Sequence, residues 1–146
     1  MDIPQPSHPF LHRTPAQTRF NDYDLLGHLN NNIYLVLADM GKAGYFRDAA
    51  PHLWDWRNVA MVVASIKCDF YAPSFPDEPL DILTAVTRIS TSTITLEQRI
   101  VNPLRADEVK CIVTTVMVHV DPTARHSAPI PPEWTEAIST FEQHKF

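Results

Sequence analysis

The most informative hydrophobic pattern in this chain runs from about residue 31 to residue 46. Apolar and small residues recur there at the three- and four-residue spacing of an α-helix, beginning with Ile33 and Leu37. Other apolar residues fill most of the remaining circumference, which leaves mainly Asp39 and Lys42 polar. Because a helix that is apolar almost all round is a buried one, the pattern predicts one long central helix that ends near residue 48.

The other segments alternate with a two-residue period or are rich in β-branched residues, and both features are typical of strands. The strands predicted in this way cover residues 10–20, 59–71, 80–89, 93–101 and 108–120. Pro15 either restricts the first of them to an edge of the sheet or interrupts it. In the second, alternate positions from Ala60 to Phe70 are apolar, and we expect this face to cover the helix. Strands do not alternate with helices, which predicts an antiparallel sheet of about five strands and the α+β class.

The length of 146 residues suits one domain with a true core, so we expect residues 1–146 to form a single domain. The prolines within residues 1–9 predict an extended arm. Pro132 is well placed in the first turn of a short C-terminal helix, whose apolar stripe includes Trp134. A single long helix leaves the outer apolar face of the sheet uncovered, so we expect a homo-oligomer.

Composition excludes several classes of protein. The net charge is -5 and no basic cluster is present, which argues against a nucleic-acid partner. No apolar run approaches the ~20 residues of a membrane span, and the N-terminus lacks an export pattern, so we expect a cytoplasmic protein. The seven histidines show no pair at ligand spacing within one element, and we expect no metal.

The densest group of polar residues lies directly before the predicted helix and includes Asp24, His28 and Asn31. Gly27 suits a sharp turn there, and an asparagine at positions 30–32 can cap the helix. The amide groups of a first helical turn carry partial positive charge and can bind an anion or a developing oxyanion. A carboxylate beside such donors is a minimal set of groups for acyl transfer or proton abstraction.

The run Asp24-Leu25-Leu26-Gly27-His28-Leu29-Asn30-Asn31, followed by Tyr34, resembles the D-x-x-G-H-x-N-N-x-x-Y signature of hotdog-fold acyl-CoA thioesterases of the 4-hydroxybenzoyl-CoA thioesterase type. The resemblance covers about residues 12–142. It implies a hotdog fold, in which a curved sheet wraps the long central helix, and protomers that pair into homodimers or homotetramers with the active site at the interface. It also implies a thioester of coenzyme A or of acyl carrier protein as substrate, with no cofactor apart from the coenzyme A of the substrate.

The resemblance implies roles for three residues in particular. Asp24 would be the nucleophile or the general base, and the backbone N–H of Asn31 would polarise the thioester carbonyl. Asp39 aligns with an acidic residue that holds a hydroxyl of the acyl group. A subgroup of the family has a histidine where this chain has Asn31, so His28 is the nearby imidazole. We expect His28 either to orient a group beside Asp24 or to pack against the turn.

The remaining predicted substrate contacts are Gly27, Asn30, Tyr34 and Trp54. Several residues have a structural alternative. Asp24 can bond its own backbone in a turn, Asn30 can act as a helix cap, and Trp54, with Trp56, can cover the open end of the core. Asp39 in an apolar helix needs an acyl hydroxyl or a basic partner if it is buried.

The sequence therefore predicts an acyl-CoA thioesterase. Two alternatives stay open. One is a hotdog enoyl- or hydroxyacyl-thioester hydratase or dehydratase, in which Asp24 and His28 act as an acid/base pair. The other is a non-catalytic protein that binds acyl thioesters. The Asn-Asn-x-x-Tyr continuation after His28 favours hydrolysis.

Overall fold

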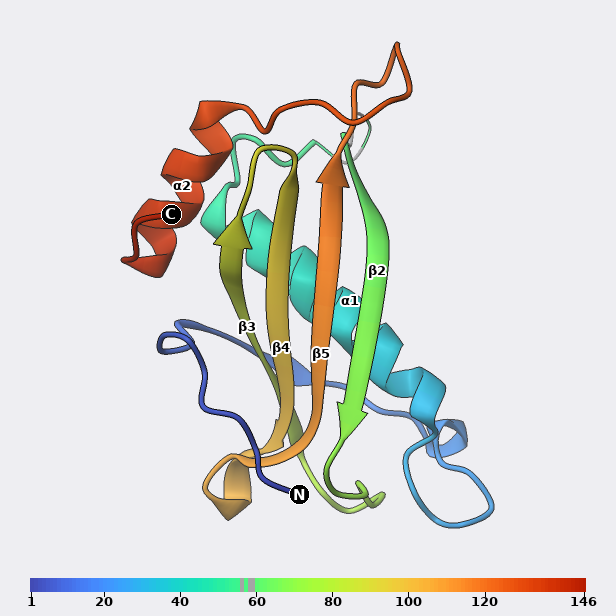
Figure 1. Cartoon of the computed structure of the whole chain (residues 1–146). Coiled ribbons are helices and arrows are strands. Elements are labelled where there is room, and N and C mark those ends of the chain that lie inside the picture. Colours follow the sequence, from blue (N-terminus) through green and yellow to red (C-terminus); the bar gives the residue numbers. More distant parts are fainter. Residues whose placement is uncertain (56, 58–59) are drawn as a thin grey trace.

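The computed structural model describes residues 1–55, 57 and 60–146 and contains one antiparallel sheet of five strands in the order β1-β3-β4-β5-β2. The elements are β1 (His12–Ala16), η1 (Phe20–Asp22), α1 (Asn31–Ala49), β2 (Met61–Phe70), β3 (Leu80–Ile89), β4 (Thr93–Asn102), η2 (Pro103–Arg105), β5 (Glu108–His119) and α2 (Pro132–Glu142). Helix α1 crosses one face of the sheet diagonally, and α2 lies beside the end of α1 (Figure 1). The predicted α+β class is confirmed. The predictions for Trp56 and for the start of a strand at Val59 lie outside the described residues.

Helix α1 forms the centre of the core. Its buried side chains pack against the concave face of the sheet in two clusters, one around Tyr34 and Leu37 and one around Tyr45 and Phe46. The second cluster also contains the apolar stripe of α2, including Trp134. The long helix and the short C-terminal helix therefore occur where the sequence predicts them.

The prediction that α1 is buried all round is wrong for a single chain. Its outer face leaves Leu35, Val36 and Met40 exposed by 36%, 51% and 43%. One sheet can cover only one side of a helix, so these apolar residues on the opposite side remain partly exposed within one chain. An apolar surface of this kind is typical of an interface with another protein.

The outer face of the sheet is less exposed than the sequence predicts. Leu83, Val101 and Arg99 point away from α1, yet they are nearly fully buried. The N-terminal arm, which contains neither helix nor strand, contributes to this cover. The Arg99 guanidinium donates to the Pro4 carbonyl at 2.7 Å and lies 5.5 Å from the centre of the Phe10 ring. Part of the face that was expected to be uncovered is thus closed within the chain.

Strand β2 has a β-bulge that the sequence pattern does not reveal. Its pairing with β5 shifts between Val63 and Ser65, so one extra residue changes which positions face the helix. Ile66 and Cys68 lie opposite core positions of β5, whereas Val62 lies on the outer face. The single apolar face predicted from Ala60 to Phe70 is therefore correct only after the bulge.

The other strand predictions agree with the structure apart from their ends. Strand β1 is shorter than predicted and lies at the sheet edge, as Pro15 requires. Strands β3 and β4 form the predicted hairpin, which is closed by a hydrogen bond from Ser90 N–H to the Thr93 carbonyl. Strand β5 lies between β4 and β2, as expected for a central strand. In the described part of the chain, no helix is long and apolar enough to cross a membrane.

Gly41 brings α1 into direct contact with the sheet. A Cβ atom built at this position would lie 2.5 Å from Ile82 Cγ2 and 2.9 Å from Gln98 Nε2. Neither neighbour can easily move, because Ile82 is fully buried and Gln98 Nε2 donates to the Ala38 carbonyl at 2.7 Å. At Gly44 the nearest atom to such a Cβ would be 3.4 Å away, which is an ordinary contact distance.

We therefore predict that Gly41→Ala destabilises the fold by about 1–3 kcal/mol, the usual cost of overpacking a core. Gly44→Ala is the matched control in the same helix, and it should be neutral or stabilising by up to about 1 kcal/mol, because alanine is the better helix former. Urea unfolding at one fixed protein concentration measures both. Equal effects of the two substitutions would contradict the proposed close contact at Gly41.

Candidate active site

The turn before α1 is built around Asp24 and Gly27. One carboxylate oxygen of Asp24 accepts a hydrogen bond from Leu26 N–H at 2.9 Å, and the Asp24 carbonyl accepts one from Gly27 N–H at 3.0 Å. Gly27 has a φ of 77°, a conformation that favours glycine, which confirms its predicted place in the turn. The Asp24 side chain is exposed and makes the backbone contact that its structural alternative describes.

Helix α1 begins as the sequence predicts. The Asn30 side chain accepts from Asn32 N–H at 3.0 Å, and Ile33 N–H donates to the Asn30 carbonyl. These bonds confirm Asn30 as the helix cap. They leave Asn31 N–H without an acceptor among the residues that the structure describes. One donor of the first turn is therefore free to bind a ligand atom.

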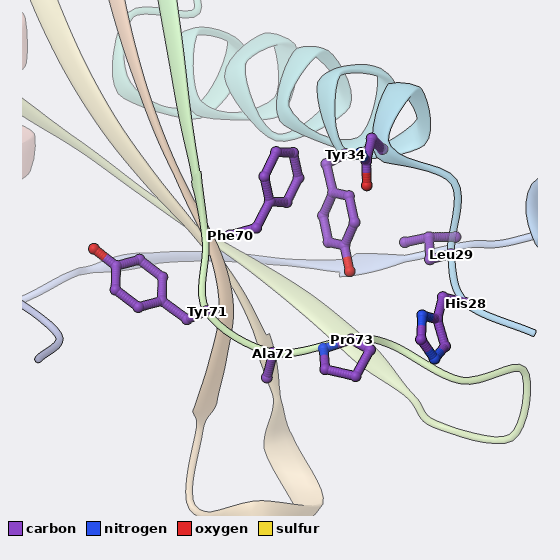
Figure 2. A pocket seen from close by; sticks show the side chains of 8 residues that line it. His28, Leu29, Tyr34, Phe70, Tyr71, Ala72 and Pro73 are labelled. Carbon is purple, nitrogen blue, oxygen red and sulfur yellow. The ribbon is translucent and has the colours of Figure 1, made fainter. Parts of the chain in front are cut away.

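A pocket of about 300 Å³ lies at this end of α1. Figure 2 shows the residues that line it, which come from the turn, from α1 and from the end of β2. They are His28, Leu29, Asn31, Tyr34, Phe70, Tyr71, Ala72 and Pro73. Asn31 thus combines a free backbone donor with a position in the pocket wall. The volume is at the lower end of the range for small-molecule sites, which is about 300–1,000 Å³.

The segment that follows β2 forms one wall of the pocket and is tied to α1. Its Ser74 hydroxyl lies 2.8 Å from the Tyr34 hydroxyl, and its Ser74 carbonyl accepts from Leu29 N–H at 2.9 Å. The Tyr34 ring also packs edge to face on Phe70, with 5.4 Å between the ring centres, and the two rings lie side by side in Figure 2. Burial raises the pKa of Tyr34, so this hydroxyl stays protonated near neutral pH.

His28 lines the pocket from the turn before α1. Its ring packs edge to face on Phe75 with 5.2 Å between the ring centres. In the described part of the chain the imidazole nitrogens have no hydrogen-bond partner, and no hydrogen bond joins the His28 and Asp24 side chains. The two residues are connected through the backbone instead, by Asp24 N–H and the His28 carbonyl at 2.9 Å. His28 therefore packs beside the turn, as one of its two predicted roles requires, and its ring stays accessible from the pocket.

Five of the predicted site residues do not line this pocket within one chain, and two of them, Gly27 and Asn30, belong to the turn and the helix cap described above. Asp24 lies in the adjacent turn. Asp39 is exposed and bonded to Lys42 Nζ at 2.7 Å, so its carboxylate is not buried and needs no acyl hydroxyl to offset burial. Trp54 stacks on Phe46 with 5.4 Å between the ring centres, which is the core-covering arrangement. The roles of these residues toward a substrate remain predictions.

Residues 18–138 match a protein family described as the Thioesterase-like superfamily. This chain belongs to that superfamily. A Bacillus subtilis protein named YsmA is 27% identical over 81 residues, which cover 56% of this chain and 54% of the relative. The chain therefore matches about half of the length of this curated relative.

Several solved structures of thioesterases have the same fold as this chain. A Thermus thermophilus thioesterase, crystallised with coenzyme A and Zn, superposes with a TM-score of 0.80 at 22% identity, covering 92% of this chain and 96% of that one. A 1,4-dihydroxy-2-naphthoyl-CoA thioesterase from Synechocystis gives a TM-score of 0.76 at 19% identity, covering 87% and 94%. At this level of identity the likeness concerns the fold, and it confirms the predicted hotdog architecture. Among the described residues, no group of three His, Cys, Asp or Glu side chains is placed to hold a metal ion.

Sequence reasoning missed most of the pocket wall that follows β2. Ser74 and Phe75 belong to a proline-rich loop, which the sequence indicates only as a break between strands. No periodic signal points to their contacts, because Ser74 and Tyr34 are 40 residues apart in sequence. The prolines around them were the available clue, since rigid loops next to a helix end often carry binding residues.

We predict that Tyr34→Phe and Ser74→Ala each destabilise the superfamily domain by about 1 kcal/mol, because each removes one partner of a buried hydrogen bond. The double variant should lose less than the sum, with a coupling energy of about 1 kcal/mol. Urea unfolding measures all three. Tyr23→Phe is the control, since its hydroxyl makes a similar 3.0 Å bond to Thr18 in a less buried place. If the losses of unfolding free energy from Tyr34→Phe and Ser74→Ala simply add up in the double variant, the result would contradict a hydrogen bond between the two hydroxyls.

Proposed function

We propose that this domain hydrolyses the thioester bond of an acyl-CoA or of an acyl carrier protein to the free acid and the thiol. The observation that carries this proposal is the free N–H of Asn31, a residue that lines a pocket at the start of α1 within a thioesterase-like domain. A thioester oxygen placed there would accept this hydrogen bond, and the positive end of the helix dipole would stabilise the negative charge that develops on it. Coenzyme A takes part only as the substrate, and no further cofactor is proposed.

The reaction needs a group that supplies or activates the attacking oxygen, and we assign this role to Asp24. As a nucleophile, its carboxylate would attack the carbonyl carbon, expel the thiolate and form an anhydride that water then hydrolyses. As a general base, it would take a proton from the attacking water, and the thiolate would leave with the electrons of the carbon–sulfur bond. Only one Asp24 oxygen is occupied by the turn, since Leu26 N–H bonds to Oδ1.

The site is incomplete in one chain, and we propose that a second copy completes it. Three apolar side chains near Asp24 are largely exposed: Phe20 on η1 by 100%, and Leu25 and Leu26 on the same turn by 107% and 79%. These side chains would be poorly placed in water unless another surface covers them. A covered turn would also enclose Asp24, which strengthens electrostatic effects at its carboxylate.

Strand β2 offers the surface for this second copy. It is a ten-residue strand at the edge of the sheet, and Val62, Val63, Ile66 and Phe70 are exposed along it. A long apolar edge strand invites pairing with another strand. Two copies related by a twofold axis can pair their β2 strands antiparallel and so close the pocket that Phe70 helps to line. We propose a homodimer of this kind as the active unit, and a tetramer can form from two such dimers.

Asp24→Asn tests the assignment of the reacting group. We expect thiol release from acyl-CoA substrates to fall by about 10²–10⁴-fold, because the amide is neither a base nor a nucleophile. Stability should change by less than about 0.5 kcal/mol, since the amide oxygen can still accept from Leu26 N–H. Asp121→Asn is the matched control, because Asp121 Oδ1 makes the same type of bond to Thr123 N–H at 2.8 Å. Hydrolysis by Asp24→Asn at the wild-type rate would refute the assignment.

A panel of short, long, branched and aromatic acyl-CoA substrates, with the free thiol followed colorimetrically, tests the reaction itself. Release of thiol supports hydrolysis. Water addition or loss on enoyl- or hydroxyacyl-CoA without thiol release would support the hydratase or dehydratase alternative. Binding of acyl-CoA without any turnover would support a non-catalytic binding protein.

Ile66→Lys tests the dimer. Ile66 lies near the middle of β2, so a twofold axis would bring the two introduced charges close together and weaken association. We expect a dimer-to-monomer shift by light scattering, a loss of thiol release at the same protein concentration, and a retained circular dichroism spectrum. Leu104→Lys is the control, because Leu104 is a similarly apolar side chain with 80% exposure on η2, away from β2. Full activity of a monomeric wild-type chain would contradict the dimer proposal.

A further inference from the structure

A buried lysine lies behind the pocket wall that follows β2. The Lys110 side chain, on β5, is only 2% exposed. Its ammonium group donates to the Pro73 carbonyl at 3.1 Å and to Glu108 at 2.9 Å, and it lies 3.2 Å from Glu78 Oε2. The bond from Lys110 lowers the pKa of Glu108, which therefore stays ionised near neutral pH.

The backbone of the same residue holds the same wall. The Lys110 carbonyl accepts hydrogen bonds from Tyr71 N–H at 2.9 Å and from Ala72 N–H at 3.3 Å. Lys110 therefore fixes three consecutive residues, Tyr71, Ala72 and Pro73, and all three line the pocket in Figure 2. The Tyr34–Ser74 bond holds the next residue of this segment from the side of α1.

Glu78 extends this connection to His28, which lies on the turn before α1. Glu78 Oε2 accepts from Phe75 N–H at 3.1 Å, and Glu78 Oε1 accepts from the Lys110 ammonium group at 3.3 Å. Phe75 in turn carries the ring on which His28 packs. Lys110 is thus linked to His28 through Glu78 and Phe75, although Lys110 does not itself line the pocket.

We propose that Lys110 is a positioning residue of the thioesterase site, which fixes residues 71–75 as a rigid wall against which the substrate binds. This inference rests on the proposed function. A lysine is an expensive way to stabilise a fold, because its ammonium group must be removed from water and matched by carboxylates, whereas apolar side chains of similar volume serve stability as well or better. Here the charge is bound to the backbone carbonyl of the wall, where an apolar side chain could not replace it.

The chain offers a matched control in Arg99. This second cation is also buried, with 7% of its side chain exposed, and it pairs with Glu97 at 2.7 Å. It also donates to a backbone carbonyl, that of Pro4, at 2.7 Å. Residue 4 belongs to the N-terminal arm and does not line the pocket. Arg99→Met and Lys110→Met therefore make the same kind of change, and only the second concerns the pocket wall.

Steady-state kinetics of thiol release compares these two variants. We expect Lys110→Met to raise KM for the best acyl-CoA of the panel by about tenfold or more, with kcat within about threefold of wild type, because the wall binds substrate but does not react. Arg99→Met should leave both constants within about twofold of wild type while lowering stability to a similar degree. Equal kinetic effects of the two variants, or an effect of Lys110→Met on kcat alone, would overturn the proposal.

Hydrogen exchange provides a second measurement that does not depend on activity. We expect Lys110→Met to speed amide exchange at Tyr71, Ala72 and Phe75, and Arg99→Met to leave these amides as protected as in wild type. Unchanged protection of these amides in Lys110→Met would overturn the proposal. If Lys110→Met does not fold, because two carboxylates lose their partner, the double variant with Glu78→Gln takes its place, since a glutamine oxygen can still accept from Phe75 N–H.

The two measurements separate this inference from the proposed function. Failure of the wild-type protein to release thiol from any acyl-CoA would refute the proposed function, and the exchange rates would then still decide whether Lys110 fixes the wall. Thiol release by wild type, with unchanged KM and unchanged exchange in Lys110→Met, would refute the inference alone.

Discussion

The close contact between α1 and the β3–β4 hairpin determines where the other parts of this domain lie. At Gly41 the helix backbone approaches Ile82 and Gln98 so closely that there is no space for a side chain. Gln98 also bonds to the helix through the Ala38 carbonyl, which fixes the helix along its axis as well as across it. With its middle held in this way, α1 can present its first turn at only one place, next to the segment that follows β2.

That segment is held by hydrogen bonds, whereas the helix is held on the sheet mainly by apolar packing. Burial of apolar surface holds the helix on the sheet but has no preferred direction. The wall from Tyr71 to Phe75 is instead fixed by hydrogen bonds from both sides, through Ser74 toward α1 and through Lys110 toward β5. Directed bonds of this kind keep a loop in one conformation, which a binding pocket needs.

The pocket and the predicted reacting group meet at the edge of the chain rather than inside it. Asn31 lines the pocket, Asp24 lies on the exposed turn beside it, and exposed apolar side chains lie nearby. A small domain with a single long helix has too little material to enclose such a site by itself. The exposed faces of α1 and β2 are where the proposed second copy would cover the site. A long thioester bound across such an interface would not require a deep cavity in either chain.

The sequence by itself determined the helix, its asparagine cap, the turn at Gly27 and the strands, because each of these depends on local spacing or on the conformation of one residue. The resemblance to the family signature pointed to Asn31, and the local pattern predicted the helix start at which this residue lies. Only the tertiary structure decided which apolar faces remain exposed, that a bulge in β2 changes which residues face the helix, and that Ser74 and Lys110 hold the pocket wall. These features depend on contacts between residues far apart in the chain, and no local pattern encodes the partner of a buried hydroxyl or of a buried charge.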